Sequence, residues 1–474
     1  MNAREQEGSG IRASTLLRVR TLWLAPIAMT VILMFFMTLF YIGAIVNPTG
    51  HLSGLPVALV NEDSGGALHG SHVNFGAEVA SDLRHSSGVT SRLSLDEISY
   101  AQAKAQMNSG KAYAAIVIPP GFTASLLSAY GLSSAPSGTP VIQLPTNPRA
   151  GSMGVQLATG VAQPALQQVS NAVGSKLSSE AAKLGSTPRS GVDTANPITV
   201  TTSDFRAVPP DSALGLSAFY TSLLALMCGF LGAVLVNSSI DAALGYGTTE
   251  IGPRWRQRMP VAISRWQTLL TKWSVALTAV PILTGILLLV AAGILNMNAP
   301  HAGELWLFMS FAGIAIAAGT LALLAAFGSL GQLLAMLLFV YLALASSGGT
   351  VPVQALPSFF RFAATFEPLR QVLGGVRAIL YFNAQADAGL TRGLVLTAIG
   401  LIFWLIAGAA VTRWYDRRGL DRLQPDVLEF VQRSARAYTA AAQDPAPSRE
   451  TGNEVQTMTP LSETAVPGDQ SPAV

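Results

Sequence analysis

The sequence ALGLSAFYTSLLALMCGFLGAVLV, residues 213–236, opens the stretch that decides the fold, and that stretch continues to Val411. Nearly all charged residues of this stretch stand in the connections between apolar segments. Cutting at those connections leaves segments of roughly 17–25 residues, the length of a helix that crosses ~30 Å of hydrocarbon. The stretch therefore predicts five transmembrane helices, Ala213–Val236, Trp273–Leu295, Leu305–Phe327, Leu330–Ser346 and Leu394–Val411.

A sixth apolar segment, Leu22–Val46, stands apart near the N-terminus and follows the arginines 4, 12, 18 and 20. A cleaved signal peptide has a shorter apolar core and a small-residue cleavage site. Here the apolar run is longer, and Asn47-Pro48 follows it. We therefore expect an uncleaved signal anchor, with the preceding arginines on the cytoplasmic side.

The composition is that of an integral membrane protein. Of the 474 residues, 50% are hydrophobic and only 12% are charged, whereas a soluble domain carries about 25% charged residues. The net charge of +3 gives no broad basic field for nucleic acid. The single cysteine, Cys228, excludes an intrachain disulfide and a cysteine-based zinc site.

Residues 47–211 have the composition of a soluble domain, and short β-branched runs alternate there with helical patterns. The expected strands are Leu55–Val60, Val89–Leu93, Ala112–Ile118, Val141–Leu144 and Ile198–Phe205. The expected helices are Ala67–Arg84, a helix capped by Ser94 with Glu97 that runs to Asn108, Gly121–Tyr130 and Gly151–Leu184. This alternation predicts a small α/β domain.

The charges of the connections predict the topology. The connection Asn237–Lys272 holds five basic and two acidic residues, Asn296–Glu304 holds no Lys or Arg, and an arginine cluster follows Val411. By the positive-inside rule these segments are cytoplasmic, external and cytoplasmic in turn. Reading Leu330–Ser346 as re-entrant would place the last cluster outside, so we expect six spans.

The predicted fold class is an α-helical polytopic membrane protein of the plasma (inner) membrane, with six transmembrane helices in a one-plus-five layout and an inserted extracytoplasmic α/β domain. Its parts are a cytoplasmic N-terminus (1–21), a first helix (22–46), the α/β domain (47–211), a five-helix domain (212–412) and a cytoplasmic tail (413–474). Glycines, prolines and aromatics predict an interfacial segment at 347–391. The tail has a helical patch up to Ala442 and then a composition typical of disorder.

Several kinds of chemistry have no signature in the sequence. There is no Gly-x-x-x-x-Gly-Lys-Ser/Thr loop, so we expect no ATP hydrolysis by this chain. The six apolar segments contain no Asp, Glu, Lys, Arg or His, which counts against a proton-driven transporter. We find no Gly-x-Ser-x-Gly elbow and no Ser/His/Asp set, so we expect no enzyme, no catalytic residue and no cofactor.

Two groups of residues could be metal sites, one made of histidines and one of acidic residues. His69 and His72 would share one face of the expected helix, with Glu78 and His85 further along. A solvated helix end is the preferred interpretation. Glu62-Asp63 could bind a cation, but a turn before a helix N-terminus, which favours acids, explains the pair better. We predict no metal site.

The best candidate for a partner surface is Gly-Pro-Arg-Trp-Arg-Gln-Arg, residues 252–258, in the connection Asn237–Lys272. Its contact residues would be Arg254, Trp255, Arg256 and Arg258. They could bind anionic lipid headgroups or a separate protein, and the two interpretations are compatible.

Three passages resemble the type-2 ABC transporter permeases, and more narrowly the phage-infection-protein (YhgE/Pip) branch and the fungal nitrosoguanidine-resistance membrane proteins. They are LPVALVNEDSG (55–65), YAAIVIPPGFTASL (113–126) and SGGTVPVQALPSFF (347–360), the last followed by Pro368 and Gly375-Val376-Arg377. The positions that carry the resemblance are Asn61, Glu62, Asp63, Pro119, Gly348, Gly349, Pro352, Pro357, Pro368 and Arg377. Relatives often have two prolines around a hydrophobic-aromatic segment, where this chain has Phe366-Glu367-Pro368.

The resemblance implies a permease subunit that forms a homodimer in the lipid bilayer and works with a separate ATP-binding-cassette ATPase. The expected function is export of a hydrophobic or amphiphilic compound. The alternative is a non-transporting envelope receptor or assembly scaffold that acts through the external domain, which makes up about a third of the chain.

Overall fold

The computed structural model describes residues 20–68, 70–133 and 138–420, together with residues 422, 429 and 433. The chain divides into two units, Met1–Asp421 and Arg422–Val474. All the elements considered below belong to the first unit. The N-terminal arginines 4, 12 and 18, His69 and the helical patch predicted up to Ala442 lie outside the described residues, apart from positions 422, 429 and 433.

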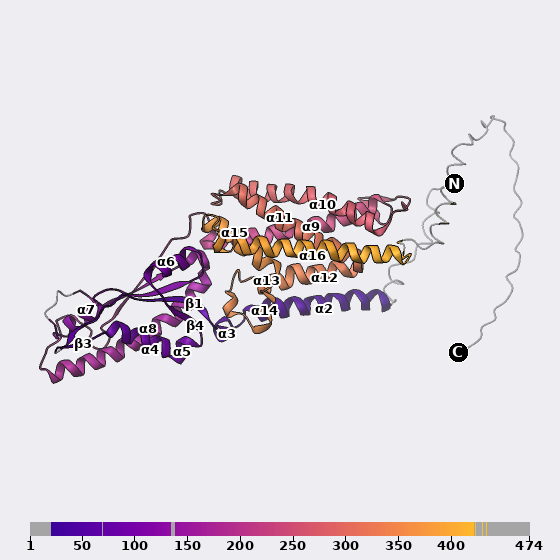
Figure 1. Ribbon diagram of the computed structural model, residues 1–474. Helices are drawn as coiled ribbons and strands as arrows, with labels where there is room; N and C mark the ends of the chain where they lie inside the picture. The colour runs from indigo at the N-terminus through magenta and orange to yellow at the C-terminus, as the bar shows by residue number, and fades with distance from the viewer. Residues whose placement is uncertain are drawn as a thin grey trace, which may run out of the picture. The chain divides into compact units, whose positions relative to one another are not determined.

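The described residues contain six helices that are long and apolar enough to cross a membrane, which matches the predicted number. They run side by side (Figure 1). By label they are α2 (Arg20–Ile45), α9 (Ser217–Ala243), α10 (Arg265–Leu288) with its π-helical end η3 (Leu289–Ile294), α11 (Ala302–Phe327), the continuous run α12 (Ser329–Met336), η4 (Leu337–Leu342) and α13 (Ala343–Ser346), and α16 (Leu390–Arg417). The weakest predicted segment, Leu330–Ser346, is thus one helical run of 18 residues, about 27 Å long at 1.5 Å per residue.

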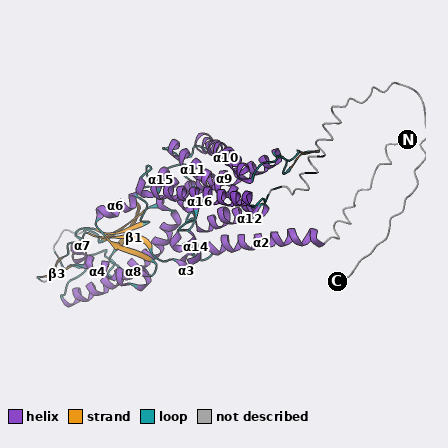
Figure 2. Cartoon of the chain, turned by 45° about the vertical axis from the view of Figure 1, so that its right-hand side comes forward, coloured by secondary structure: helices purple, strands orange, loops and turns teal. Residues whose placement is uncertain are grey.

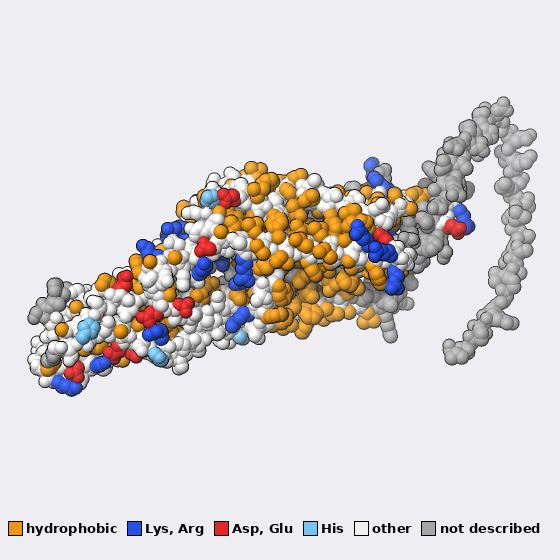
Figure 3. Space-filling model, in the orientation of Figure 1, with side chains coloured by type: hydrophobic (Ala, Val, Ile, Leu, Met, Phe, Trp, Pro, Cys, Tyr) orange, Lys and Arg blue, Asp and Glu red, His pale blue; other side chains and the backbone are white. Residues whose placement is uncertain are grey.

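Helix α11 is the centre of the bundle. It packs on α9, α10, α12 and α16, and 78% of its most apolar window is buried, against 6% for α2 and for α16. Small residues allow this close packing: a Cβ atom on Gly229 would meet the carbonyl oxygen of Gly313. Figure 3 shows a belt of hydrophobic side chains over the bundle, with Lys and Arg at both borders of the belt.

The helices extend beyond the apolar segments, and this corrects the predicted connection Asn237–Lys272. Asp241 lies in α9 and Lys272 in α10, so the connection itself covers only residues 244–264. The Lys272 ammonium group donates to Asn237 Oδ1 (2.7 Å) and pairs with Asp241 Oδ1 (2.8 Å). Lys272 is only 6% exposed, so the ion pair is a buried link between α9 and α10.

Contacts at the same end of the bundle bring the ends of four helices together. The Asp416 carboxylate of α16 accepts from the backbone N–H groups of Arg265 (2.9 Å) and Trp266 (3.1 Å), which begin α10. The Tyr415 hydroxyl donates to the carbonyl of Ala326, near the end of α11. With the Lys272–Asp241 pair, these contacts place the arginine cluster after Val411 and the connection 244–264 on one side of the bundle.

Residues 55–204 form an α/β domain around a five-stranded sheet (Figure 2). Its order is β4-β1-β5-β6-β7, with strands β1 (Leu55–Asn61), β4 (Leu93–Glu97), β5 (Ala114–Ile118), β6 (Val141–Thr146) and β7 (Thr199–Asp204). All neighbours are parallel except β5 and β6. Its helices are α4 (Phe75–His85), α5 (Ser87–Thr90), α6 (Tyr100–Asn108), α7 (Phe122–Ala129) and α8 (Ser152–Lys183), and the short helix α3 (Pro48–His51) precedes the domain.

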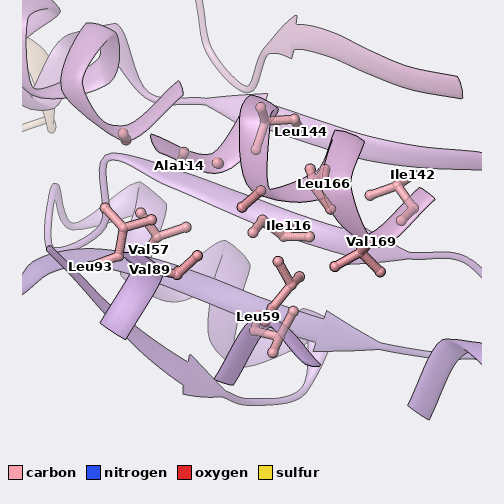
Figure 4. Close-up of a cluster of buried hydrophobic side chains, with 14 of the residues drawn as sticks. Val57, Leu59, Val89, Leu93, Ala114, Ile116, Ile142, Leu144, Leu166 and Val169 are labelled. Atoms are coloured by element: carbon pink, nitrogen blue, oxygen red, sulfur yellow. The ribbon is translucent and has the colours of Figure 1, made fainter. Parts of the chain in front are cut away.

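Strand β1, which lies between β4 and β5, is buried on both faces. Val57 and Leu59 pack in the core that includes residues of α4, α5 and α8 (Figure 4). Ala58 and Val60 pack on the other face with Ala103 and Met107 of α6. Because both faces of the sheet are covered here, the sequence of this strand is continuously apolar and does not alternate between apolar and polar residues.

For two helices of this domain the predicted N-terminal end was wrong. Strands β2 (Gly66–Leu68) and β3 (Ser71–Val73) pair antiparallel, and the helix begins only after Asn74, whose side chain accepts from Ala77 N (2.7 Å). The Ser94–Glu97 box is part of β4, because this segment pairs with β1. Ser99 caps α6 instead, with Gln102 completing the capping box. The strand predicted from Val89 begins at Leu93.

Residues 347–391 hold η5 (Val353–Ala355), α14 (Ser358–Ala363), α15 (Pro368–Tyr381) and η6 (Ala386–Ala388). Ten of the 14 residues of α15 are buried, and the helix packs on α9, α11 and α16. The Tyr381 hydroxyl at its end bonds with Ser217 Oγ (2.8 Å) at the start of α9. The longest helix in the segment 347–391 is thus largely enclosed.

Candidate functional site

Helix α15 positions most of the polar groups at the α/β-domain end of the bundle. Its N-cap is Glu367, whose carboxyl oxygens accept from the backbone N–H groups of Leu369 (2.6 Å) and Arg370 (2.9 Å). Glu367 is 1% exposed, and burial raises its pKa to about 8 against the opposing effect of these bonds. At neutral pH the carboxyl group is therefore mostly protonated.

A cavity of about 300 Å³, which we call the basic pocket, lies between the α/β domain and residues 347–392. Its charged lining is Lys111, Arg370, Arg377, Asp387 and Arg392. Arg370 and Arg377 are two helical turns apart on α15 and so share one face. Lys111 and Asp387 form an ion pair of 3.2 Å, and both side chains are exposed.

The three arginines of the basic pocket have no carboxylate partner among the described residues. Arg377 donates to the carbonyl of Gly349 (3.3 Å), and its buried Nε has no hydrogen-bond partner. Arg392 donates to Gln371 Oε1 (3.0 Å). Burial, with a further contribution from the charge of Arg392, lowers the pKa of Arg370. The pocket therefore gathers three guanidinium groups that have no ion pair among the described residues.

Gly348 makes room for this arrangement. Its φ of +72° lies in the left-handed region, and a Cβ atom there would come within 3.0 Å of Arg370 Nη1 and 2.7 Å of Val353 Cγ2. A larger residue would be strained in its backbone and would press on the pocket.

A second cavity of about 340 Å³, which we call the apolar groove, lies between α11, η4, the start of α15, and α16. Its lining contains no charged residue; it is Ala312, Ala315, Ile316, Leu338, Phe339, Thr365, Phe366, Pro368, Gln371, Val372, Leu396, Thr397, Ile399, Gly400, Phe403 and Trp404. A Cβ atom on Gly400 would meet nothing within 4 Å. The groove runs beside a π-helical turn, a feature often found at functional sites.

Gln371 lines both cavities and is 4% exposed. Its amide nitrogen donates to the carbonyls of Ala364 (3.2 Å) and Thr365 (3.3 Å), while its oxygen accepts from Arg392. Gln371 thus lies between the charged cavity and the apolar one.

The predicted partner surface lies at the other end of the bundle, where β8 (Thr248–Ile251) and β9 (Arg254–Gln257) form an antiparallel hairpin. Arg254, Trp255 and Arg256 lie on β9, and Arg258 follows it. Arg254 and Arg258 line a hollow of about 980 Å³ with the end of α9. The side chains of Trp255 and Arg256 are outside the described part of the structure.

Four of the positions that carry the family resemblance lie at the end of β1 and β5. Asp63 is buried and accepts from Gly76 N (3.2 Å), Thr123 N (3.2 Å) and Thr123 Oγ1 (2.5 Å). Asn61 Oδ1 accepts from Asp63 N, the Glu62 N–H donates to the Ile118 carbonyl, and Pro119 follows β5. The Asp63 carboxylate thus stabilises the N-termini of α4 and α7.

The other positions gather around α15. Pro352 and Pro357 are the N-caps of η5 and α14, and Pro368 is the first residue of α15. Gly349 lies against the ring of Phe219, Gly348 approaches Arg370, and Arg377 lines the basic pocket. The third passage therefore builds the segment that holds the two cavities.

The histidine pattern does not form the predicted helical face, because His72 lies in β3 and bonds to the Ser64 carbonyl (2.9 Å). His85 lies in α4 and bonds to the Ser81 carbonyl (2.7 Å). The described residues contain no group of three His, Cys, Asp or Glu side chains that could hold a metal ion.

Arg370, Gln371 and Arg392 were not among the predicted site residues. The spacing of Arg370 and Arg377 in an amphipathic run was visible, and it could have indicated a charged helix face. That Arg392 approaches this face from the next helix depends on the tertiary structure.

Comparison with known proteins gave one family. The family described as "ABC-2 family transporter protein" matches residues 15–410. No curated protein and no solved structure matched the chain.

Proposed function

The chain belongs to the ABC-2 family of transporter proteins, and on this premise we propose that it is the permease subunit of an ABC-type export system for an amphiphilic compound. The observation that carries the proposal is the pair of cavities that share Gln371. A charged cavity beside an apolar one fits a molecule with a polar and an apolar part.

The energy would come from a separate ATP-binding-cassette ATPase. ABC-2 permeases typically work with such a partner, and the 474 residues contain no phosphate-binding loop of their own. The hairpin with Arg254 and Arg258 is the proposed contact surface, and anionic lipid headgroups are the other candidate for these arginines. We propose no catalytic activity for the chain itself.

The proposed location is the plasma membrane, with both termini in the cytoplasm and the α/β domain outside. The positive-inside rule supports this orientation, because the connection 244–264 and the arginines after Val411 lie at the same end of the bundle. The homodimer and the YhgE/Pip-like branch rest on the resemblance of the three sequence passages.

Export is tested by filling the apolar groove. Gly400→Leu places a side chain in the open groove, and Gly43→Leu on α2, where a Cβ atom also meets nothing within 4 Å, is the matched control. Cells that lack the protein should retain more of a panel of fluorescent single-chain amphiphiles than wild-type cells. Gly400→Leu should behave like the loss of the protein, and Gly43→Leu like wild type.

The scaffold alternative rests on the α/β domain, which has a core of its own on the face of α6. Deleting residues 60–200 separates the two functions. Lost binding of a phage or envelope partner with unchanged export supports the scaffold. Equal retention of every amphiphile with and without the protein would contradict export.

A further inference from the structure

We propose that the basic pocket binds the anionic headgroup of the transported amphiphile, whose hydrocarbon chain lies in the apolar groove. This inference rests on the proposed function and assigns the substrate a chemical class: a single-chain amphiphile with a phosphate or carboxylate headgroup.

The first argument is the uncompensated charge. The lining has four basic side chains and one acidic side chain, and the acid, Asp387, pairs with Lys111 at the exposed rim. The three arginines have no ion pair among the described residues, although Arg377 and Arg392 each keep one hydrogen bond within the protein, to Gly349 and Gln371. Like charges in a partly buried site repel one another, so an anion that bridges them is favoured twice, by attraction and by relief of repulsion.

The second argument is hydrogen-bonding capacity. The Arg377 Nε is buried without a partner, and among the described residues the Arg370 guanidinium group has neither an ion pair nor a hydrogen bond. Both side chains extend from one face of α15 into the same cavity. A planar guanidinium group donates two parallel hydrogen bonds to phosphate or carboxylate, which gives both affinity and orientation.

The third argument is the neighbouring groove. Its polar side chains are few (Thr365, Gln371, Thr397 and the Trp404 indole) and none carries a charge. A headgroup would lose its hydration there without compensation, whereas an alkyl chain would be favoured. Gln371 lies between the two cavities and lines both, and we infer that a single molecule with its headgroup on Arg370 extends its chain past this side chain into the groove.

The test measures binding to the purified full chain in a neutral detergent, with three probes: a lysophosphatidate, a monoacylglycerol of the same chain length, and inorganic phosphate. The lysophosphatidate should bind most tightly, because only this probe fills both cavities. Gly400→Leu should weaken binding of both lipids, and Gly43→Leu should weaken neither.

Arg370→Gln should weaken lysophosphatidate binding about ten- to hundredfold and leave monoacylglycerol binding unchanged. Arg370→Lys, which keeps the positive charge, should lose less affinity for lysophosphatidate than Arg370→Gln. Arg392→Gln is a second variant at an exposed side chain, and Arg189→Gln, on the exposed surface of the α/β domain, is the control.

Equal lysophosphatidate affinity in Arg370→Gln, Arg392→Gln and Arg189→Gln would overturn the proposal, as would equal affinity for the neutral monoacylglycerol. If inorganic phosphate binds as tightly as lysophosphatidate, the pocket is a site for free anions and the apolar groove does not contribute to binding. The measurement needs no ATPase and no transport. If lysophosphatidate binds as expected but cells export no amphiphile, only the proposed function is contradicted. If cells export amphiphiles but lysophosphatidate affinity does not depend on the arginines, only the assignment of the basic pocket is contradicted.

Discussion

Glu367 is a carboxyl group whose burial links the fold to pH. Its pKa rises from an ordinary value of 4.5 to about 8 in the folded chain. Between these values the folded state keeps a proton that the unfolded state releases. Its contribution to stability is therefore complete below about pH 4.5 and is lost as the pH rises toward 8.

We predict that Glu367→Gln makes the stability of the folded chain depend less on pH. The thermal midpoint of the wild-type chain in detergent should fall between pH 5 and pH 8 by more than that of the variant. The difference in stability should be of the order of 3 kcal/mol over this window. Parallel slopes in the two proteins would show that Glu367 is ionised in the folded state.

Gly349 is a residue whose smallness the packing requires, because a Cβ atom there would overlap the ring of Phe219. We predict that Gly349→Ala lowers the stability by about 1–3 kcal/mol, the usual cost of overpacking. Gly43→Ala, with open space at its Cβ, is the control in the same thermal measurement. If the thermal midpoint of Gly349→Ala equals that of the wild type, then α9, which carries Phe219, can move away from Gly349 to make room for the methyl group.

At the scale of elements, the N-terminus of α10 depends on a carboxylate from α16. Asp416 accepts from the N–H groups of Arg265 and Trp266. We predict that Asp416→Ala costs about 1 kcal/mol and that Asp416→Asn costs less, as at other helix caps. Lys111→Ala breaks an exposed ion pair and should cost less still. The three thermal midpoints, measured together, check this order.

The sequence predicted most elements because their signals are local. Apolar length identified the six helices that are long and apolar enough to cross a membrane, and turn residues follow β1 and β5. The errors occurred where tertiary pairing competes with a local pattern. Ser94 and Glu97 match a capping box, yet pairing with β1 makes that segment a strand. The His69–His72 spacing looked helical, yet His72 lies in a hairpin.

The strand order and the two cavities could not be predicted for a related reason. The order β4-β1-β5-β6-β7 depends on how long connections cross the sheet. The basic pocket joins Lys111 with Arg370 and Arg392, which are far apart in the sequence. Only α15 gave a local signal, through two arginines seven residues apart.

At the scale of the whole molecule, the six helices predict a topology. Reporter fusions after Ala299 and after Gly389 should both report an external position. A fusion after Gly252, in the hairpin, should report a cytoplasmic one. A cytoplasmic signal at Gly389 would mean that the 18-residue run Ser329–Ser346 does not cross the membrane.

The central claim is that this chain is a permease driven by an ATPase on another chain. Its most direct test is photo-crosslinking in native membranes from residues 254 and 258, with residue 189 of the α/β domain as the control position, followed by mass spectrometry. The account predicts that an ATP-binding-cassette subunit is cross-linked from 254 and 258 and not from 189. The absence of any ATP-binding subunit from all the cross-linked and co-purified material would contradict it.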